Sequence, residues 1–487
     1  MLTVHLRITD AATTRPVPVR VCVTTADGTP HAPLGRSPEF AAGRNEDVGG
    51  QLKLGRERWF YIDGACEMPL PAGVPLRVRA AKGPEWVPLD EDVTLGPGQI
   101  SLRFSIARWA DMGAEGWVTA DTRCHFLSPH AALLEARAED LDVTNLLVTP
   151  FRLLALDANT YATAPNLLAF SGQSPALEAG AHAVYVNTFN SHPVLGKVSL
   201  LNSHRPVLPL TFGGEEPDDW GVCDWADQCH RKGGLVVWSD AFEPLSGVTG
   251  GEALVAAVLG KIDAIEVVQK PGRAPLLPWV YRLWDAGVRV PLVGASAKDS
   301  NAIRLGAIRT YARAEGNLPP GPLPEGKGRE EVAEPRPKTD GLSAVAERPF
   351  PSGRGPGGGS PSPPFPGAGA RGSWLAAVRT GRTFVTSGPL LALAVEGSRA
   401  TVRARACGAE PRVELIANGA AVAAGEGSAE AVLGEPGWVA ARVTGATGFA
   451  HTSPVAVRAP ARKREAVSAL LTLIEHTREW VETLGRF

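Results

Sequence analysis

Long hydrophobic runs and paired cysteines are missing from this sequence. No apolar stretch reaches the roughly 20 residues that a transmembrane helix needs, so no membrane partner is expected. The six cysteines are scattered and include no Cys-x-x-Cys pair, which disfavours a disulfide framework and a zinc finger. The first residues alternate like a β-strand, without the basic start and apolar core of a signal peptide. These absences favour a cytoplasmic protein with free thiols.

An excess of charge of one sign is also missing. Charged residues make up 21% of the chain and the net charge is −2, so no attraction to nucleic acid is expected. The sequence contains neither the Gly-x-x-x-x-Gly-Lys-Ser/Thr pattern of phosphate-binding loops nor the Gly-x-Ser-x-Gly pattern of serine hydrolases. Both of these enzyme classes are therefore disfavoured. Nothing in the sequence specifies an oligomeric state.

The sequence of 487 residues divides into regions that differ in composition and in hydrophobic pattern. Residues 1–109 alternate in short runs and predict an N-terminal β-sandwich. Residues 110–315 alternate helix formers with apolar runs, which predicts an α/β domain with a mostly parallel sheet, open or closed into a barrel. Residues 316–372 are rich in Pro and Gly and predict a disordered insertion. Residues 373–487 predict further strands in a C-terminal β-sandwich and a terminal amphipathic helix that packs on the body.

Polar side chains follow the predicted strands of the α/β domain. Asp121 and His125 follow the first strand, Asp240 follows a Val-Val-Trp strand, and Asp299 follows a later one. The carboxyl ends of parallel strands meet at one edge of a sheet, so these groups are expected to lie close together. Carboxylate oxygens and imidazole nitrogens are ligands of divalent metals. The alternative for each residue alone is a capping aspartate or a packed histidine. His192 and Ser239 are expected near the same edge.

Several segments resemble one known family in order along the chain. They are residues 116–128, which contain Asp-Thr-Arg-Cys-His, and residues 136–147, 193–202, 227–238, 298–301 and 381–391. Together they resemble the CehA/McbA family of the PHP (polymerase and histidinol phosphatase) metallohydrolases. The resemblance implies a distorted β/α barrel, which residues after 373 help to complete, between small β-sandwiches in a multi-domain α+β protein. It implies divalent metals at the strand ends, cleavage of an ester, carbamate or phosphoester, and a pocket position for Ser387.

The sequence departs from the family pattern at the metal ligands. The family has a His-x-His, a Gly-His, a Glu, a Pro-His and a late Asp, where this chain has Arg123, Lys197, Phe189, Ser239 with Asp240, and Ala297. Arginine keeps its proton in proteins, and a lysine beside a dication would have to lose its own. A site for several metals is therefore not expected.

The residues leave three functional hypotheses open. In the first, the chain is a hydrolase relative with altered or residual activity, and one Zn, Mn or Fe ion binds to Asp121, His125, Asp240 and Asp299, or no metal binds. In the second, Arg123 and Lys197 replace lost metal charge and hold a small anionic ligand, a carboxylate or phosphate; the alternative is that both merely pair with nearby aspartates. In the third, the flanking β-sandwiches bind a partner and the α/β domain is a scaffold.

Overall fold

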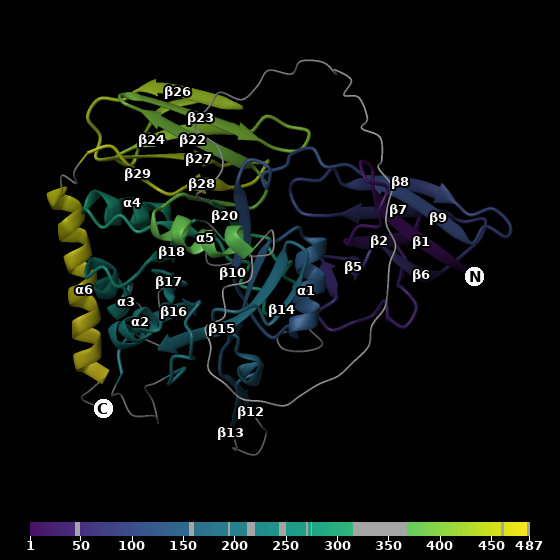
Figure 1. The fold of residues 1–487 in the computed structure, drawn as a ribbon, viewed down its shortest axis with the longest axis horizontal. Coiled ribbons are helices and arrows are strands. Elements are labelled where there is room, and N and C mark those ends of the chain that lie inside the picture. Colours follow the sequence, from purple (N-terminus) through teal and green to yellow (C-terminus); the bar gives the residue numbers. More distant parts are fainter. Residues whose placement is uncertain are drawn as a thin grey trace, which may run out of the picture.

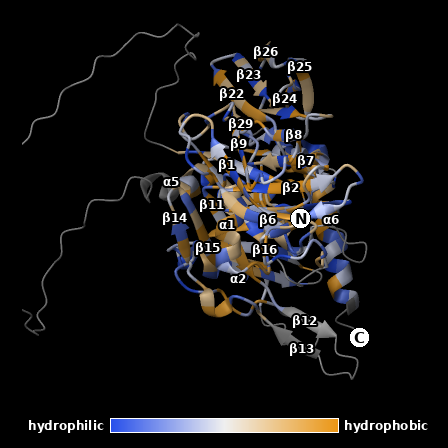
Figure 2. Ribbon diagram, turned by 90° about the vertical axis from the view of Figure 1, so that its right-hand side faces the viewer, coloured by the Kyte–Doolittle hydropathy of each residue, from blue (hydrophilic) through white to orange (hydrophobic). Residues whose placement is uncertain are grey.

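The computed structural model describes residues 1–43, 49–154, 160–192, 195–211, 220–242, 250–268, 271–273, 275–314, 368–458 and 462–484. The predicted disordered insertion at 316–372 lies outside this set, except that helix α5 begins at Ala368. An N-terminal β region, a central α/β region and a C-terminal β region lie side by side, and helix α6 runs along the body (Figure 1). Hydrophobic colour runs along strands in each region (Figure 2). The molecule is multi-domain and rich in sheet.

The N-terminal region consists of two sheets around one core. The first has the order β6-β1-β9 and the second the order β4-β5-β2-β7-β8, with β3 beside β2. The strands are β1 (Leu2–Asp10), β2 (Val19–Thr25), β3 (Pro30–His31), β4 (Gln51–Leu54), β5 (Glu57–Ile62), β6 (Ala65–Leu70), β7 (Pro75–Ala81), β8 (Leu89–Thr94) and β9 (Ser101–Ile106). Alternate side chains of both sheets, such as Val4, Leu6, Val21, Phe60 and Val78, are fully buried in one cluster.

The central region contains one curled sheet with helices packed on both of its faces. Its strands are β10 (Trp117–Cys124), β11 (Val143–Val148), β14 (Leu177–Ala179), β15 (His182–His192), β16 (Gly196–Leu201), β17 (Leu235–Ser239), β18 (Ala264–Glu266) and β19 (Leu292–Val293), with a hairpin of β12 (Phe151–Leu154) and β13 (Thr160–Thr163). Its helices are α1 (Pro129–Ala138), α2 (Val222–Arg231), α3 (Gly251–Val258), α4 (Leu277–Asp285) and α5 (Ala368–Arg379), with a short 3-10 turn at Leu167–Ala169. Ser128 caps α1 by accepting from the Ala131 amide at 3.1 Å.

Strand direction follows connection length. β10, β11 and β15 are mutually parallel neighbours, as are β17, β18 and β19. β16 is antiparallel to both β15 and β17, so the prediction of a mostly parallel sheet fails at this strand. The reason is that β15 ends at His192 and β16 begins at Gly196, and so short a connection joins only antiparallel strands.

The two ends of this sheet approach each other without pairing as strands. The Ala297 amide donates to the Arg123 carbonyl at 3.0 Å, and the His125 amide donates to the Lys298 carbonyl at 2.7 Å. Cys124 and Lys298 form an isolated parallel bridge. Among the described residues the strand pairs form an open path rather than a ring. The sheet is therefore curled and nearly closed, and the predicted barrel is not established.

The C-terminal region continues the central sheet. β10 pairs with β20, and the path runs on through β21, β28, β27, β24 and β25, while β22, β23 and β26 form a second sheet that shares a core with it. The strands are β20 (Arg309–Arg313), β21 (Thr383–Thr386), β22 (Leu390–Glu396), β23 (Arg399–Arg405), β24 (Arg412–Ala417), β25 (Ala420–Glu426), β26 (Ser428–Val432), β27 (Trp438–Val443), β28 (Ala450–Thr452) and β29 (Val455–Ala456). Helix α6 (Arg464–Leu484) packs against α3 and α4. None of the helices in the described residues is long and apolar enough to cross a membrane.

Glu139, at the end of α1, joins the N-terminal region to the central one. This carboxylate is fully buried and accepts from Arg20 at 2.6 Å, from the Tyr61 hydroxyl at 3.0 Å and from Arg304 at 2.9 Å. Burial opposes ionisation of Glu139, but Arg20 and Arg304 outweigh it and lower the pKa of the carboxyl. One anion therefore holds donors from β2, β5 and the segment before β20.

Candidate functional site

The candidate site lies where the central strands end. The backbone turns sharply there, because Phe126, Asp240, Phe242 and Ala297 have positive φ angles of 62°, 47°, 55° and 50°. This left-handed conformation is unfavourable for residues with a Cβ. Backbone held in such a conformation is over-represented at functional sites, where the surrounding structure compensates its cost. The turns place polar side chains of several strands at one edge of the sheet.

Arg123 is the centre of a buried ion-pair network at this edge. Its Nη2 donates to Glu266 Oε2 at 2.7 Å and to Asp240 Oδ1 at 2.8 Å, and its Nε lies 3.1 Å from both Glu266 oxygens. Lys197 Nζ donates to the other Asp240 oxygen at 3.1 Å. We call these four residues the strand-end network. They come from β10, β16, the end of β17 and β18.

Two serines extend the strand-end network. Ser239 donates to Glu266 Oε1 at 2.8 Å, and its hydroxyl lies 2.7 Å from that of Ser199 on β16. The ring of Phe189 covers Arg123, with 5.2 Å between the guanidinium carbon and the ring centroid. Glu266 and Ser239 are almost completely buried. The network is thus a largely buried set of charge-assisted hydrogen bonds, with Lys197 as its most exposed member.

The charges of the strand-end network balance. Burial opposes ionisation of Asp240, but Arg123 and Lys197 outweigh it and lower the pKa of its carboxyl. Burial also opposes protonation of Arg123, and Asp240 and Glu266 outweigh it and raise the pKa of the guanidinium. Burial raises the pKa of Glu266, and Arg123 opposes this rise. With two cations facing two carboxylates, the set is neutral when all four groups are ionised.

Asp121, a predicted metal ligand, binds the backbone instead. Its Oδ1 accepts from the amides of Arg123 at 3.1 Å and Ser296 at 3.0 Å, and its Oδ2 accepts from the Gly306 amide at 2.9 Å. The side chain is fully buried. Asp121 therefore ties the end of β10 to the segments after β19 and before β20.

His125 is buried beside the strand-end network. Its Nδ1 lies 3.2 Å from the Leu147 carbonyl, and its ring packs edge-on against Phe189 with centroids 5.2 Å apart. Burial, together with the nearby Arg123 cation, lowers the pKa of His125 to about 4. The imidazole is therefore neutral at pH 7 and packed among aromatic rings.

The remaining predicted residues occupy different places. Asp299 is 8% exposed at the same edge, and its neighbour Lys298 is fully buried, donating to the Ile303 carbonyl at 2.8 Å and lying 3.5 Å from Glu135. His192 Nδ1 accepts from the Leu195 amide at 2.8 Å and so holds the β15–β16 turn. Ser387 bonds to Phe449 and lines a separate cavity of about 270 Å³ that no residue of the strand-end network lines.

The carboxylates at this edge have other partners in this arrangement. Asp121 accepts from three backbone amides, Asp240 is held by two cations, and Glu266 by Arg123 and Ser239. Among the described residues no group of three or more His, Cys, Asp or Glu side chains is arranged to hold a metal ion. Of the predicted ligands, only Asp240 belongs to the strand-end network.

Glu266 is the member of the strand-end network that the sequence analysis did not predict. The predicted site residues follow apolar runs, whereas Glu266 is the last residue inside the short strand β18, between Ile265 and Val267. A carboxylate between such apolar neighbours is almost never fully buried unless it is paired. That pattern, an acid in an otherwise apolar strand, is the signal that could have found it.

Comparisons with known proteins leave the family undetermined. No family model and no curated protein matches the chain. Among solved structures, PsfC from Pseudomonas syringae PB-5123 is 17% identical over 42% of this chain and 85% of its own, with a TM-score of 0.28. The lesion-specific endonuclease PfuEndoQ from Pyrococcus furiosus is 11% identical over 41% of this chain and 53% of its own, with a TM-score of 0.26. TM-scores of this size do not establish a shared fold, so the PHP-type assignment stays a prediction.

Proposed function

We propose that this chain is a PHP-type hydrolase relative that has lost metal-dependent hydrolysis, with the strand-end network in the place of a metal centre. One observation carries the proposal: the guanidinium of Arg123 bonds to both Glu266 and Asp240, at 2.7 and 2.8 Å, and the second cation, Lys197, completes the charge balance. The negative charge of a carboxylate paired in this way is already balanced by its cationic partners, so its attraction for a dication is weakened.

The curled sheet supports the PHP-type part of the proposal. Its strands β10, β11, β15, β16, β17, β18 and β19 follow one another in chain order, and the segment after β19 returns to β10 through backbone hydrogen bonds. Polar groups gather at the edge where those strands end. In α/β barrels this edge carries the active site.

Electrostatic repulsion supports the non-catalytic part. Two unit charges about 4 Å apart interact by about 4 kcal/mol at an effective dielectric constant of about 20, so a guanidinium at that distance from a dication offsets about 8 kcal/mol of the attraction that the two carboxylates would otherwise supply. Arg123 is only 4% exposed, so water screens this repulsion little. A metal would have to displace Arg123 or be held by residues elsewhere.

The test combines metal content with hydrolysis. The protein is purified without chelator, its Zn, Mn and Fe are measured by mass spectrometry, and p-nitrophenyl acetate, p-nitrophenyl phosphate and bis-p-nitrophenyl phosphate are supplied as substrates. We expect well below one metal per chain, no hydrolysis above background and the same Tm with EDTA as without. One bound metal per chain, whose removal lowers the Tm and whose hydrolysis Asp240→Asn abolishes, would overturn the proposal.

A second candidate function is the binding of a small anion. Arg123 and Lys197 converge on a single carboxylate, Asp240, and the Lys197 side chain is 22% exposed, so an external carboxylate or phosphate has a route to the same cations. Phosphate and succinate are expected to raise the Tm of the native protein but not that of Arg123→Ala. Lys261→Met, which removes an exposed ion pair with Asp227, is the matched control. An equal shift in Arg123→Ala removes this candidate.

A further inference from the structure

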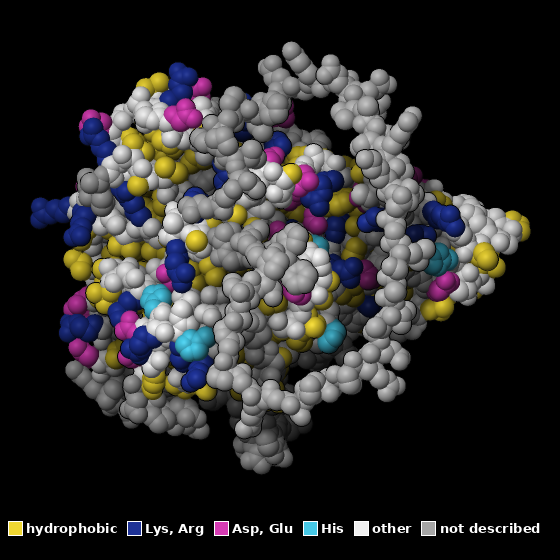
Figure 3. All heavy atoms as spheres, in the orientation of Figure 1, with side chains coloured by type: hydrophobic (Ala, Val, Ile, Leu, Met, Phe, Trp, Pro, Cys, Tyr) yellow, Lys and Arg dark blue, Asp and Glu magenta, His cyan; other side chains and the backbone are white. Residues whose placement is uncertain are grey.

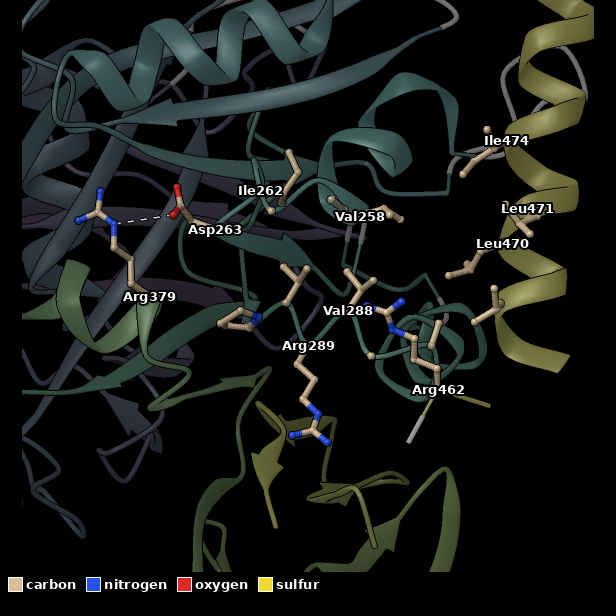
Figure 4. A pocket seen from close by; sticks show the side chains of 17 residues that line it. Val258, Ile262, Asp263, Val288, Arg289, Arg379, Arg462, Leu470, Leu471 and Ile474 are labelled. Carbon is tan, nitrogen blue, oxygen red and sulfur yellow. Dashed lines mark ion pairs between the residues drawn. The ribbon is translucent and has the colours of Figure 1, made fainter. Parts of the chain in front are cut away.

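A cavity of about 520 Å³ lies between helix α6 and the central region (Figure 4). Its floor is the end of α3 and the segments that lead into β18 and β19, and its outer wall is α6. It therefore lies where those strands begin, whereas the strand-end network lies where they end. Ligand cavities of about 300–1,000 Å³ are typical of small-molecule sites.

The walls of the cavity are apolar and partly open to solvent. Val467, Leu470, Leu471 and Ile474 line it from α6, and Val258 faces them from the end of α3. Leu470 is buried, but Leu471 is 59% exposed and Val258 is 46% exposed. Figure 2 shows hydrophobic and hydrophilic colour along the same helix. The predicted packing of the α6 apolar stripe is thus incomplete, and apolar surface faces the cavity.

The polar groups around the cavity are mainly cationic. Three arginines line it with one carboxylate, Asp263. That carboxylate is engaged by His230 at 2.8 Å, by the Val236 amide at 2.7 Å and by Arg379 at 3.8 Å. Burial lowers the pKa of Arg289, whose guanidinium points away from the α6 side chains and donates to the backbone carbonyls of Gly437 and Arg458 (Figure 4). Within the described part of the chain, neither Arg289 nor Arg462 has a carboxylate partner.

Arg462 is placed to meet an anion. Figure 4 shows its side chain extending from the segment before α6 toward Val288, with the apolar side chains of α6 above it. A ligand whose apolar body contacts Leu470, Leu471 and Val258 would bring its charged end to Arg462. A cationic or purely polar ligand would leave either the arginine or the apolar wall without a counterpart.

We propose that this cavity binds an alkyl carboxylate, with the alkyl chain against α6 and the carboxylate paired with Arg462. The proposal is independent of the strand-end network, so it stands or falls separately from the proposed function. Two properties of the site define the ligand class: an open apolar wall, which favours a chain of methylene groups, and the Arg462 guanidinium beside that wall, which favours an anionic end.

The experiment uses the full-length protein and three probes below their micelle concentrations: decanoate, decanol and decyltrimethylammonium. Titration calorimetry is expected to give one decanoate per chain, with decanol binding about threefold to tenfold more weakly and the cation more weakly still. That ratio corresponds to one partly exposed ion pair. Decanol binding as tightly as decanoate, or no saturable binding of decanoate at all, would overturn the proposal.

Variants on the exposed face of α6 locate the binding. Leu471→Asp is expected to abolish decanoate binding, because it places a like charge and a polar group on the apolar wall. Val481→Asp is the matched control, since Val481 is 43% exposed on the same helix and does not line the cavity. Arg462→Gln should weaken decanoate about threefold to tenfold and leave decanol unchanged, whereas Arg464→Gln should change neither. Equal binding by Leu471→Asp and Val481→Asp would place the ligand elsewhere.

Discussion

Glu139 with its partners and the strand-end network are two buried charge clusters that differ in their balance of cations and carboxylates. Glu139 is a single fully buried carboxylate that faces two arginines and a tyrosine from three segments, and it joins two regions of the molecule. The strand-end network balances two cations with two carboxylates inside one region. The first cluster has an excess of cations around a joint, whereas the second has no excess of either sign. Buried charge therefore joins two regions of the chain at Glu139, whereas in the strand-end network the buried charges neutralise one another.

On the molecular surface the two signs are mixed. Lys and Arg side chains alternate with Asp and Glu over the face shown in Figure 3, rather than gathering into a field of one sign. Several surface pairs, such as Arg77 with Asp90, are about half exposed on both sides and contribute little to stability. The large energetic effects are therefore expected at the two buried clusters.

The largest effect is expected from Glu139→Gln. Removing this charge leaves the partly buried Arg20 and Arg304 without their carboxylate, and breaking a buried pair from one side costs roughly 3–5 kcal/mol. Because Glu139 has two cationic partners, a loss of about 4–5 kcal/mol is expected in urea unfolding. Glu67→Gln, which breaks an exposed pair with His5, is the control and should change stability by less than about 0.5 kcal/mol. A loss below about 1 kcal/mol for Glu139→Gln would contradict a stabilising role of this charge between the two regions.

Arg123→Met is expected to rank second, at about 3–4 kcal/mol, because Asp240 and Glu266 would keep only Lys197 as a counter-charge. The double variant Arg123→Met with Glu266→Gln removes one charge of each sign and should lose less than the sum of the single variants. The coupling energy from this double-mutant cycle is expected to be about 1–3 kcal/mol in denaturant unfolding. Additive losses would show that the network is not a unit.

The pH dependence of stability gives a third test. The unfolded imidazole has a pKa of about 6.5, whereas burial lowers the pKa of His125 in the folded chain to about 4. The unfolded chain therefore binds more protons between these values, so stability falls as the pH is lowered from about 7 to 4, by about 2–3 kcal/mol per such histidine.

His451, in the C-terminal region, has a similarly lowered pKa of about 4, also chiefly because of burial. His125→Gln should thus remove about half of the slope that the two histidines produce. Urea unfolding at several pH values measures this. An unchanged slope in His125→Gln would mean that the imidazole is not neutral in the folded protein.

Lys197→Met is expected to have the smallest effect, below about 1 kcal/mol. Its ammonium group is the most exposed member of the strand-end network, and Asp240 keeps its bond to Arg123. Thermal unfolding beside wild type and Arg123→Met would measure the difference. A loss as large as that of Arg123→Met would show that both cations contribute equally to stability, and it would support an anion site at this pair.

Local sequence patterns predict much of this fold, and the contacts between segments explain the rest. The alternating strands of the N-terminal region and the αβ repetition after residue 110 are visible in the sequence because burial imposes their periodicity. The reversed direction of β16 depends on the short connection between β15 and β16. Apolar runs in the sequence do not show where these two strands end and begin, so they do not predict its length. Leu471 shares the α6 stripe with Leu470, yet only Leu470 is buried, because the facing surface is hollow there.

The candidate site was predictable in its place but not in its bonding. Asp240, Arg123 and Lys197 do lie together where the strands end. Asp121 binds three backbone amides, and no rule of residue type separates such an anchor from a metal ligand. Glu266 was missed because its position inside a strand hides it from a search of strand ends. Pairing across more than a hundred residues of sequence is set by the curl of the sheet.

The hydrogen-bonded path from β10 through β20 and β21 to β28 has a further consequence. It makes the central and C-terminal regions a single cooperative unit, because melting either would strip a ladder of backbone bonds from the other. A chain truncated after residue 314 would lose β21, the partner of β20. The backbone groups of β20 would then form an unpaired strand edge, and such edges pair with other chains and cause aggregation. Among the described residues no strand of the N-terminal region pairs with this sheet, so bonds such as those from Arg20 and Tyr61 to Glu139 hold that region to the remainder.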